Sequence, residues 1–322
     1  MPRIEVLQIH FVETFSAAWF FSLGAIFGSF LNVVVYRMPR GSEVIFRPSA
    51  CPYCTARIKP RDNLPVLGWM LLGGRCRACR LRISPRYPLV EFVTALIFLT
   101  LYFFVIWSGG QMLPLRSPDQ QVGALSNLFS PHWELITTYA FLCWLMCHLL
   151  ATSLINGDGY KVPARLVVFS TLVGFITPIV APAVHIIPVF TANTPLRVFL
   201  DRIDVGMVGL LAGTALGVIL LGIDALTKQD SRPANIVSAM GVAGLYLGWQ
   251  AAMAVTVITL VTEVIRRLFV SGFPLAGRIP MTGSVAASVL IHLLSWRWSY
   301  GLSSFSSVEL LLSRAFAEVL RN

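Results

Sequence analysis

Eight apolar stretches, most of them long enough to cross a lipid bilayer, constrain this chain more than any other feature. The chain is 56% hydrophobic and only 12% charged, which is too apolar for a soluble globular protein. The first stretch is too long for a removable signal peptide and lacks a small-residue cleavage site. The sequence therefore predicts an all-α, polytopic membrane helix bundle of about eight spans, near residues 11–35, 89–107, 133–155, 166–187, 205–223, 234–247, 251–264 and 281–294.

A polar loop between the first two stretches carries two Cys-x-x-Cys pairs. Cys51 and Cys54 form the first pair, and 21 residues separate it from the second pair, Cys76 and Cys79. Four thiolates from two tight turns can supply the tetrahedral ligands of a structural zinc ion. The alternatives are two disulfides or four unrelated thiols. Zinc is favoured if the loop lies in the cytosol, where thiols stay reduced.

The basic residues predict on which side of the membrane this loop lies. Residues 37–86 contain 11 Lys and Arg against two acids, Glu43 and Asp62, a net charge of +9. Loops on that side hold 18 of the 25 basic residues: these 11 with Lys161, Arg165, Lys228, Arg232, Arg266, Arg267 and Arg278. The positive-inside rule places such loops in the cytoplasm and the amino terminus outside. Membrane lipid is thus an expected partner. Nucleic acid is not, because no basic patch has interleaved stacking aromatics.

The same pattern divides the chain into four parts. Residues 1–36 form the first span, 37–88 the cytoplasmic cysteine loop, and 89–299 the remaining membrane domain. Residues 300–322 mix apolar and charged positions, which predicts an amphipathic tail along the membrane surface. Glycines spaced four residues apart predict close helix contacts in the first span, at Gly24 and Gly28, and in the fifth, at Gly209, Gly213 and Gly217.

Several motifs surround the cysteine pairs in the amino-terminal half, and weaker ones follow in the carboxyl-terminal half. They are GSFLNVVVYRMP at 28–39, NLPVLGW at 63–69, GRCRAC at 74–79, ISPRYPLVE at 83–91, GLYLGW at 244–249 and IPMTG at 279–283. With them, the sequence resembles the prepilin leader peptidase and N-methyltransferase family of type IV pilus and type II secretion systems.

This resemblance implies a multi-pass enzyme of the bacterial inner membrane. Family members cut a short basic leader from prepilins or pseudopilins on the cytoplasmic side, and then methylate the new amino terminus. S-adenosylmethionine would be the methyl donor if methyl transfer is retained here, although no glycine-rich nucleotide loop is present to bind it.

Cleavage in this family uses two aspartates at the membrane edge. One carboxylate acts as a base toward water while the other, protonated, polarises the scissile carbonyl. The first aspartate lies seven residues before a proline, and counting back from Pro163 gives Asn156, with Asp158 matching a second acid of that stretch. The second aspartate aligns with Ile236 or, with one gap, with Asn235. An asparagine side chain neither ionises nor shuttles a proton at neutral pH, so the sequence predicts a lost dyad and an inactive protease.

Other reactive residues have ordinary interpretations beside the functional ones. Asp158 suits a turn in Asn-Gly-Asp-Gly, and Glu91 is either functional or an ion-pair partner of Arg86 or Arg37. Glu263 is expected to pair with Arg266 or Arg267. Simple packing is favoured over a metal site for Cys143, Cys147 and His148.

Three hypotheses follow. The first is a prepilin-peptidase-like protein that has lost proteolysis and keeps the zinc loop. The second is an active aspartyl peptidase that uses Asp158 with Asp224 or Asp230. The third is a membrane adaptor whose zinc loop binds a cytosolic partner.

Overall fold

The chain folds as a bundle of helices, seen in a computed structural model that describes residues 2–111, 113–114, 123–124, 130–184, 195–226, 232–269 and 280–302. No strand occurs in these ranges. The long helices are α1 (Pro2–Arg37), α3 (Arg86–Leu101), α5 (Trp133–Gly157), α6 (Ala164–Val180), α7 (Pro195–Leu226), α8 (Pro233–Leu247), α9 (Trp249–Phe269) and α10 (Met281–Leu302). A π-helical stretch, η3 (Tyr102–Trp107), continues α3, and a five-residue helix, α2 (Leu67–Leu71), lies in the cysteine loop.

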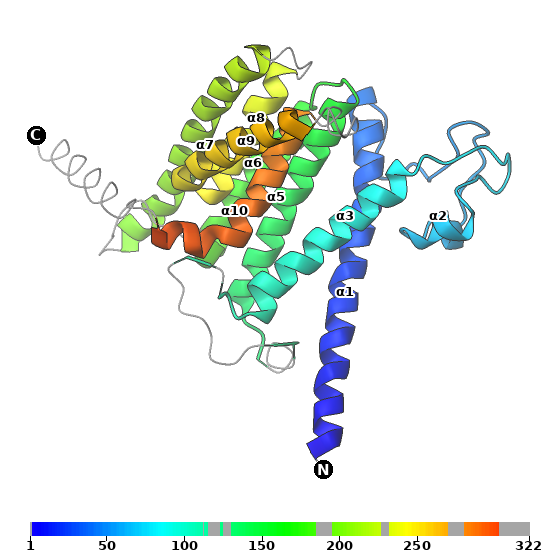
Figure 1. Cartoon of the computed structure of the whole chain (residues 1–322), viewed down its shortest axis with the longest axis horizontal. Coiled ribbons are helices and arrows are strands. Elements are labelled where there is room, and N and C mark those ends of the chain that lie inside the picture. The colour runs from blue at the N-terminus through cyan, green and yellow to red at the C-terminus, as the bar shows by residue number, and fades with distance from the viewer. Residues whose placement is uncertain are drawn as a thin grey trace, which may run out of the picture.

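The helices form two groups joined through α5. In Figure 1, α1 and α3 cross at one side of the molecule, and α5 stands between this pair and helices α6–α10. The cysteine loop, residues 37–88, leaves the bundle at the carboxyl-terminal end of α1. We call this end of the bundle the loop end.

The protein is a multi-pass membrane protein. Five segments of the described chain are long and apolar enough to cross a bilayer: Gln8–Arg40, Arg86–Trp107, Trp133–Gly157, Ile203–Ala225 and Trp249–Arg266. The predicted helical membrane bundle is therefore confirmed.

Five of the eight predicted spans meet these length and hydropathy limits within the described residues. A helix occupies each of the eight predicted places, but the apolar helices Ala164–Val180 and Ala234–Leu247 are shorter than the roughly 20 residues that a bilayer requires. Most of α8 is buried among its neighbours, so protein rather than lipid surrounds it. The predicted fourth span is also too long, because α6 ends at Val180 and a turn with Pro182 follows. Residues 185–187 of that span and 303–322 of the predicted tail lie outside the described residues.

Both predicted glycine faces are close helix contacts. A Cβ atom on Gly24 would lie 2.8 Å from Cα of Ala95, and one on Gly28 would lie 2.7 Å from Cα of Glu91. The absence of these two Cβ atoms lets α1 and α3 cross in contact. The second face, on α7, packs on α8 in the same way.

Gly213 gives the sharpest test of this packing. A Cβ atom at Gly213 would lie 2.2 Å from the carbonyl oxygen of Met240, whereas a Cβ atom at Gly222, on the same helix, would meet nothing within 4 Å. We expect Gly213→Ala to destabilise the protein by about 1–3 kcal/mol, because backbone atoms must move apart. Gly222→Ala is the matched control, and its higher helix propensity should leave stability equal or slightly higher. Thermal unfolding of both variants in detergent measures the difference. Equal melting temperatures would contradict close packing of α7 on α8.

Candidate functional site: a four-cysteine cluster and a buried amide pair

The four loop cysteines converge on one point. Their Sγ atoms all lie within 4.8 Å of one another. The Cys51–Cys79 and Cys54–Cys76 sulfur atoms are 3.9 and 4.0 Å apart. A tetrahedral ion with bonds of about 2.3 Å needs sulfur atoms about 3.8 Å apart, whereas a disulfide needs about 2.05 Å. The four cysteines are free thiols, and together they can hold one metal ion.

The turns around Cys51–Cys54 and Cys76–Cys79, here called the two knuckles, share one backbone structure. In each, the N–H of the first cysteine donates to the carbonyl of the residue five positions later, and the N–H of the residue four positions later donates back to the cysteine carbonyl. These distances are 3.0 and 3.0 Å around Cys51, and 2.9 and 3.0 Å around Cys76. The fourth following residue, Thr55 or Arg80, has a positive φ of 56° or 61°. The sequence Cys-x-x-Cys thus builds the same ligand-presenting turn twice.

The knuckle backbone also favours the ionised form of the Cys76 thiol. The N–H groups of Cys79 and Ala78 point at the sulfur of Cys76 and lower the pKa of this thiol to about 7. The N–H of Leu81 acts in the same sense on Cys79, but burial and the other three thiols outweigh it and raise the pKa of Cys79 to about 11. Four sulfur atoms this close therefore all ionise only when a cation joins them.

A second polar site lies at the loop end of the bundle. Asn156, in the last turn of α5, and Asn235, in the first turn of α8, are 5% and 1% exposed. Nδ2 of Asn235 donates a hydrogen bond of 2.8 Å to Oδ1 of Asn156. Nδ2 of Asn156 donates to Oγ1 of Thr282, at the start of α10, at 3.3 Å. We call Asn156 and Asn235 the amide pair.

Backbone groups fix the orientation of both amides. The N–H of Val162 donates to Oδ1 of Asn235 at 2.9 Å, and the carbonyl of Tyr160 accepts from its Nδ2 at 3.0 Å. The N–H of Arg232 donates to Oδ1 of Asn156 at 3.2 Å. Because a backbone N–H only donates and a carbonyl only accepts, neither side chain can be flipped without losing bonds. The pair is therefore a built network of amides.

The neighbouring residues take different roles. Ile236 is fully buried in the hydrophobic core, and the polar contacts at this position of α8 come from Asn235. Asp158 lies in the turn after α5, where both carboxylate oxygens accept from the guanidinium of Arg86, one of them at 3.0 Å. Asp158 is thus a turn residue that connects α5 to the start of α3.

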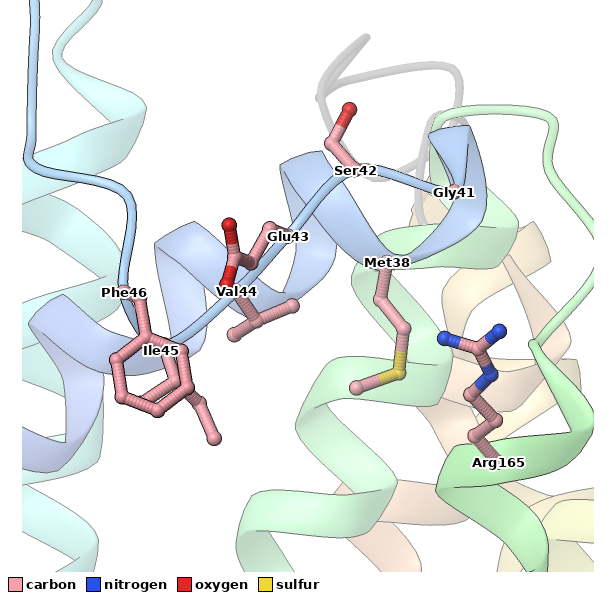
Figure 2. Close-up of a pocket in the computed structure, with 8 residues that line it drawn as sticks. All are labelled: Met38, Gly41, Ser42, Glu43, Val44, Ile45, Phe46 and Arg165. Carbon is pink, nitrogen blue, oxygen red and sulfur yellow. The ribbon is translucent and has the colours of Figure 1, made fainter.

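A groove runs beside the amide pair. A cavity of about 660 Å³ is lined by Asn235 and Ser238 of α8, by residues 161–165 before and within α6, and by Met38. A second cavity of about 400 Å³ shares Met38 and Arg165 with it. Figure 2 shows these two side chains on one side of the opening and the chain of Val44–Phe46 on the other. The groove therefore links the amide pair to the start of the cysteine loop.

Comparison with known proteins identifies the amino-terminal part. Residues 22–105 match the model of the bacterial peptidase A24 N-terminal domain. This range covers most of α1, the cysteine loop and α3. Proteins described as prepilin leader peptidase/N-methyltransferase match as well. One from Pectobacterium carotovorum subsp. carotovorum is 38% identical over 127 residues, 32% of this chain and 45% of the relative.

The amino-terminal part of the chain is similar to prepilin leader peptidases. A relative of the same description from Pseudomonas putida is 43% identical over 180 residues, 48% of this chain and 59% of the relative. One from Pseudomonas aeruginosa is 36% identical over 118 residues, 29% of this chain and 41% of the relative. The chain thus spans about half the length of the curated relatives it matches. No solved structure matches it.

The region shared with prepilin peptidases contains a contact that the sequence did not reveal. Oε2 of Glu91 accepts a hydrogen bond of 2.6 Å from the backbone N–H of Val66. Of the two interpretations of Glu91, the ion pair with Arg86 or Arg37 does not form: Arg86 binds Asp158, and Arg37 donates to the carbonyls of residues 43, 47 and 48. The only sequence signal was an acid inside an apolar span.

The expected ion pair of Glu263 is confirmed. Glu263 pairs with Arg266, whose Nε donates at 3.0 Å. Cys143, Cys147 and His148 do not join any group of metal-binding side chains in this part of the chain. Nδ1 of His148 lies 2.8 Å from Oγ of Ser170 instead, in the packed interior.

Proposed function

We propose that this protein is a prepilin-peptidase-like component of type IV pilus or type II secretion assembly that does not cleave prepilins. The amide pair carries the proposal. The resemblance places the family's aspartates at Asn156 and at Asn235 or Ile236, and the side chains of the two asparagines are hydrogen-bonded to each other. We infer that they occupy the positions of the two catalytic aspartates, with Asn235 rather than Ile236 at the second.

Two amides cannot perform the reaction of two carboxyl groups. Aspartyl cleavage needs a carboxylate to remove a proton from water and a carboxylic acid to donate a proton toward the scissile carbonyl. An amide has no proton to exchange at neutral pH. In addition, both amide hydrogens of Asn235 and its oxygen are already used within the protein. This site therefore does not catalyse cleavage, and its hydrogen bonds instead connect α5, α8 and α10.

The cysteine loop retains its four possible metal ligands, although the aspartate dyad is lost. We propose that Cys51, Cys54, Cys76 and Cys79 hold zinc and that the loop lies on the cytoplasmic side of a bacterial inner membrane, as its net charge of +9 predicts. When bound, zinc supplies a structural cross-link between the knuckles. Prepilins or pseudopilins with basic leaders are the proposed partners. Methyl transfer, the second activity in the relatives' names, is tested separately, with S-adenosylmethionine as the proposed donor.

The active-peptidase alternative has specific observations against it. An active peptidase that uses Asp158 with Asp224 or Asp230 would need Asp158 as a proton acceptor, yet both its oxygens accept from Arg86. Asp224 is buried in α7, and Asp230 lies outside the described residues.

Cleavage of a prepilin with a basic leader, by the purified protein in proteoliposomes, tests the proposal. We expect zinc at about one ion per chain, prepilin that is bound but uncut, and no change on Asp158→Ala. The Asn156→Asp/Asn235→Asp variant should gain measurable cleavage, because it restores two carboxyl groups that can share one proton.

Cleavage by the unaltered protein that Asp158→Ala abolishes would establish the second hypothesis. Absence of prepilin binding, with zinc present, would establish the adaptor. A precleaved peptide with S-adenosylmethionine, given to the same sample, measures methyl transfer.

A further inference from the structure

We propose that residues 64–71, which include α2 and are here called the α2 segment, lie within the loop-end leaflet of the membrane against lipid acyl chains. The cysteine loop then both leaves the membrane and returns to it. This inference is independent of whether the protein cleaves prepilins.

The α2 segment has an attached side and an apolar exposed side. Nε1 of Trp69 donates to the carbonyl of Ile83 at 3.1 Å, and the indole ring packs against Gly74. The opposite side presents Leu67, Met70 and Leu71, and the last two are 63% and 76% exposed. Residues 63–74 contain no charged side chain, although the loop around them contains 11 basic residues. An uncharged apolar face in so basic a loop fits acyl chains better than water.

A hydrogen bond sets the depth of the segment. The N–H of Val66, at the start of α2, donates to Oε2 of Glu91 at 2.6 Å. Glu91 lies five residues into α3 from Arg86, and Arg86 binds Asp158 at the very end of α5. Five residues of helix advance about 7.5 Å. Interfacial helices place their apolar faces about 5–10 Å into the boundary between headgroups and acyl chains, so Glu91 pins α2 at that level.

The backbone shows that this position is enforced. Val66 has a φ of +60°, which is rare for a β-branched residue and costs on the order of 1–3 kcal/mol. A Cβ atom on Gly68 would lie 2.4 Å from the carbonyl oxygen of Asp62, so only glycine permits this close approach. The segment is therefore held in one conformation, with its leucines and methionine facing outward.

The candidate membrane span to which the α2 segment is hydrogen-bonded also has exposed apolar side chains. Leu89, Phe92 and Leu96, spaced three and four residues apart on α3, are exposed large apolar side chains in a membrane span. Figure 1 shows α2 out to the side of α1 and α3, lower in the view than the rest of the cysteine loop. The position of the α2 segment and its uncharged apolar face therefore both favour lipid as the occupant.

Hydroxyl-radical footprinting of the protein in liposomes, read by mass spectrometry, tests this inference. The probe is Met70, and Tyr53, which is 70% exposed on the first knuckle, is the water-facing reference. Radicals form in water, so we expect Met70, once corrected for its higher intrinsic reactivity, to react roughly tenfold more slowly than Tyr53. Comparable rates would overturn the inference and would indicate a surface for a soluble partner.

Two variants identify what shields Met70. Leu71→Asp should pull the segment into water and raise the oxidation of Met70 severalfold, because an acidic side chain cannot extend from that depth to the surface. Leu81→Asp, at an exposed leucine of the second knuckle, is the matched control and should leave Met70 protected. Zinc content verifies that both variants are folded. Protection that persists in Leu71→Asp, or that disappears when the protein is diluted with lipid, would show that protein rather than lipid covers the segment.

Discussion

Asn235→Asp will destabilise the protein more than Asn156→Asp, although both bury a carboxyl group. Asn235 donates two hydrogen bonds, to the carbonyl of Tyr160 and to Oδ1 of Asn156, and an ionised carboxylate can donate neither. Each buried acceptor left without a donor costs about 1–3 kcal/mol. Position 156 differs because its Oδ1 only accepts, from Arg232 and Asn235, and the hydroxyl of Thr282 can rotate to donate to the second oxygen.

Thermal unfolding of both single variants in detergent, between about pH 5 and pH 8, measures this asymmetry. Protonation of the new carboxyl at position 235 restores one donor, so its penalty should shrink as the pH falls and grow as the pH rises. Each variant serves as the control for the other, since both exchange one buried amide for one carboxyl. A larger cost at position 156 would mean that the orientation of the amide pair is wrong.

Cys51→Ser/Cys76→Ser will abolish metal binding and unfold the cysteine loop while the membrane helices remain. One ligand from each knuckle is lost, and serine does not replace a thiolate on zinc. The free energy of binding a structural zinc ion in small peptides is about 10–16 kcal/mol at neutral pH, and most of it is folding free energy. Few large apolar side chains of this loop are buried, so no hydrophobic core compensates for the lost ion.

Zinc content, proteolysis of residues 42–85 and helical circular dichroism report the three parts of this expectation. Zinc should fall from about one ion per chain to none, cleavage in the loop should become rapid, and helix content should hardly change. Cys143→Ser/Cys147→Ser, two thiols buried in α5, is the matched control and should keep its zinc. A loop that stays resistant to protease without metal would show that its own contacts hold it.

The sequence predicted those parts that short-range patterns control. Two Cys-x-x-Cys pairs were enough to identify the ligand set, because each knuckle closes through bonds between residues four and five apart. Four-residue glycine spacing likewise identified the faces on which α1 meets α3 and α7 meets α8, although it did not identify the partners.

The sequence alone could not decide which residue takes the position of the second aspartate. One gap in the alignment moves the candidate from Ile236 to Asn235, and both residues are completely or almost completely buried. Only the contact with Asn156, on a helix 79 residues away in the chain, distinguishes them. The same limit applies to Glu91, whose partner is a backbone N–H in an unusual conformation rather than a charged side chain.

The shared architecture of the two knuckles has a consequence for the order of folding. Each turn can form by itself as the chain emerges, because all its backbone bonds are local. Once the first pair holds a metal ion, only the 21-residue segment between Cys54 and Cys76 has to close before the second pair can bind the same ion. The entropy of closing such a segment is about 2.7 kcal/mol, and closure of short loops takes well under a microsecond. If zinc binds as proposed, we therefore expect the supply of metal, rather than the conformational search of the chain, to limit assembly of the cysteine loop.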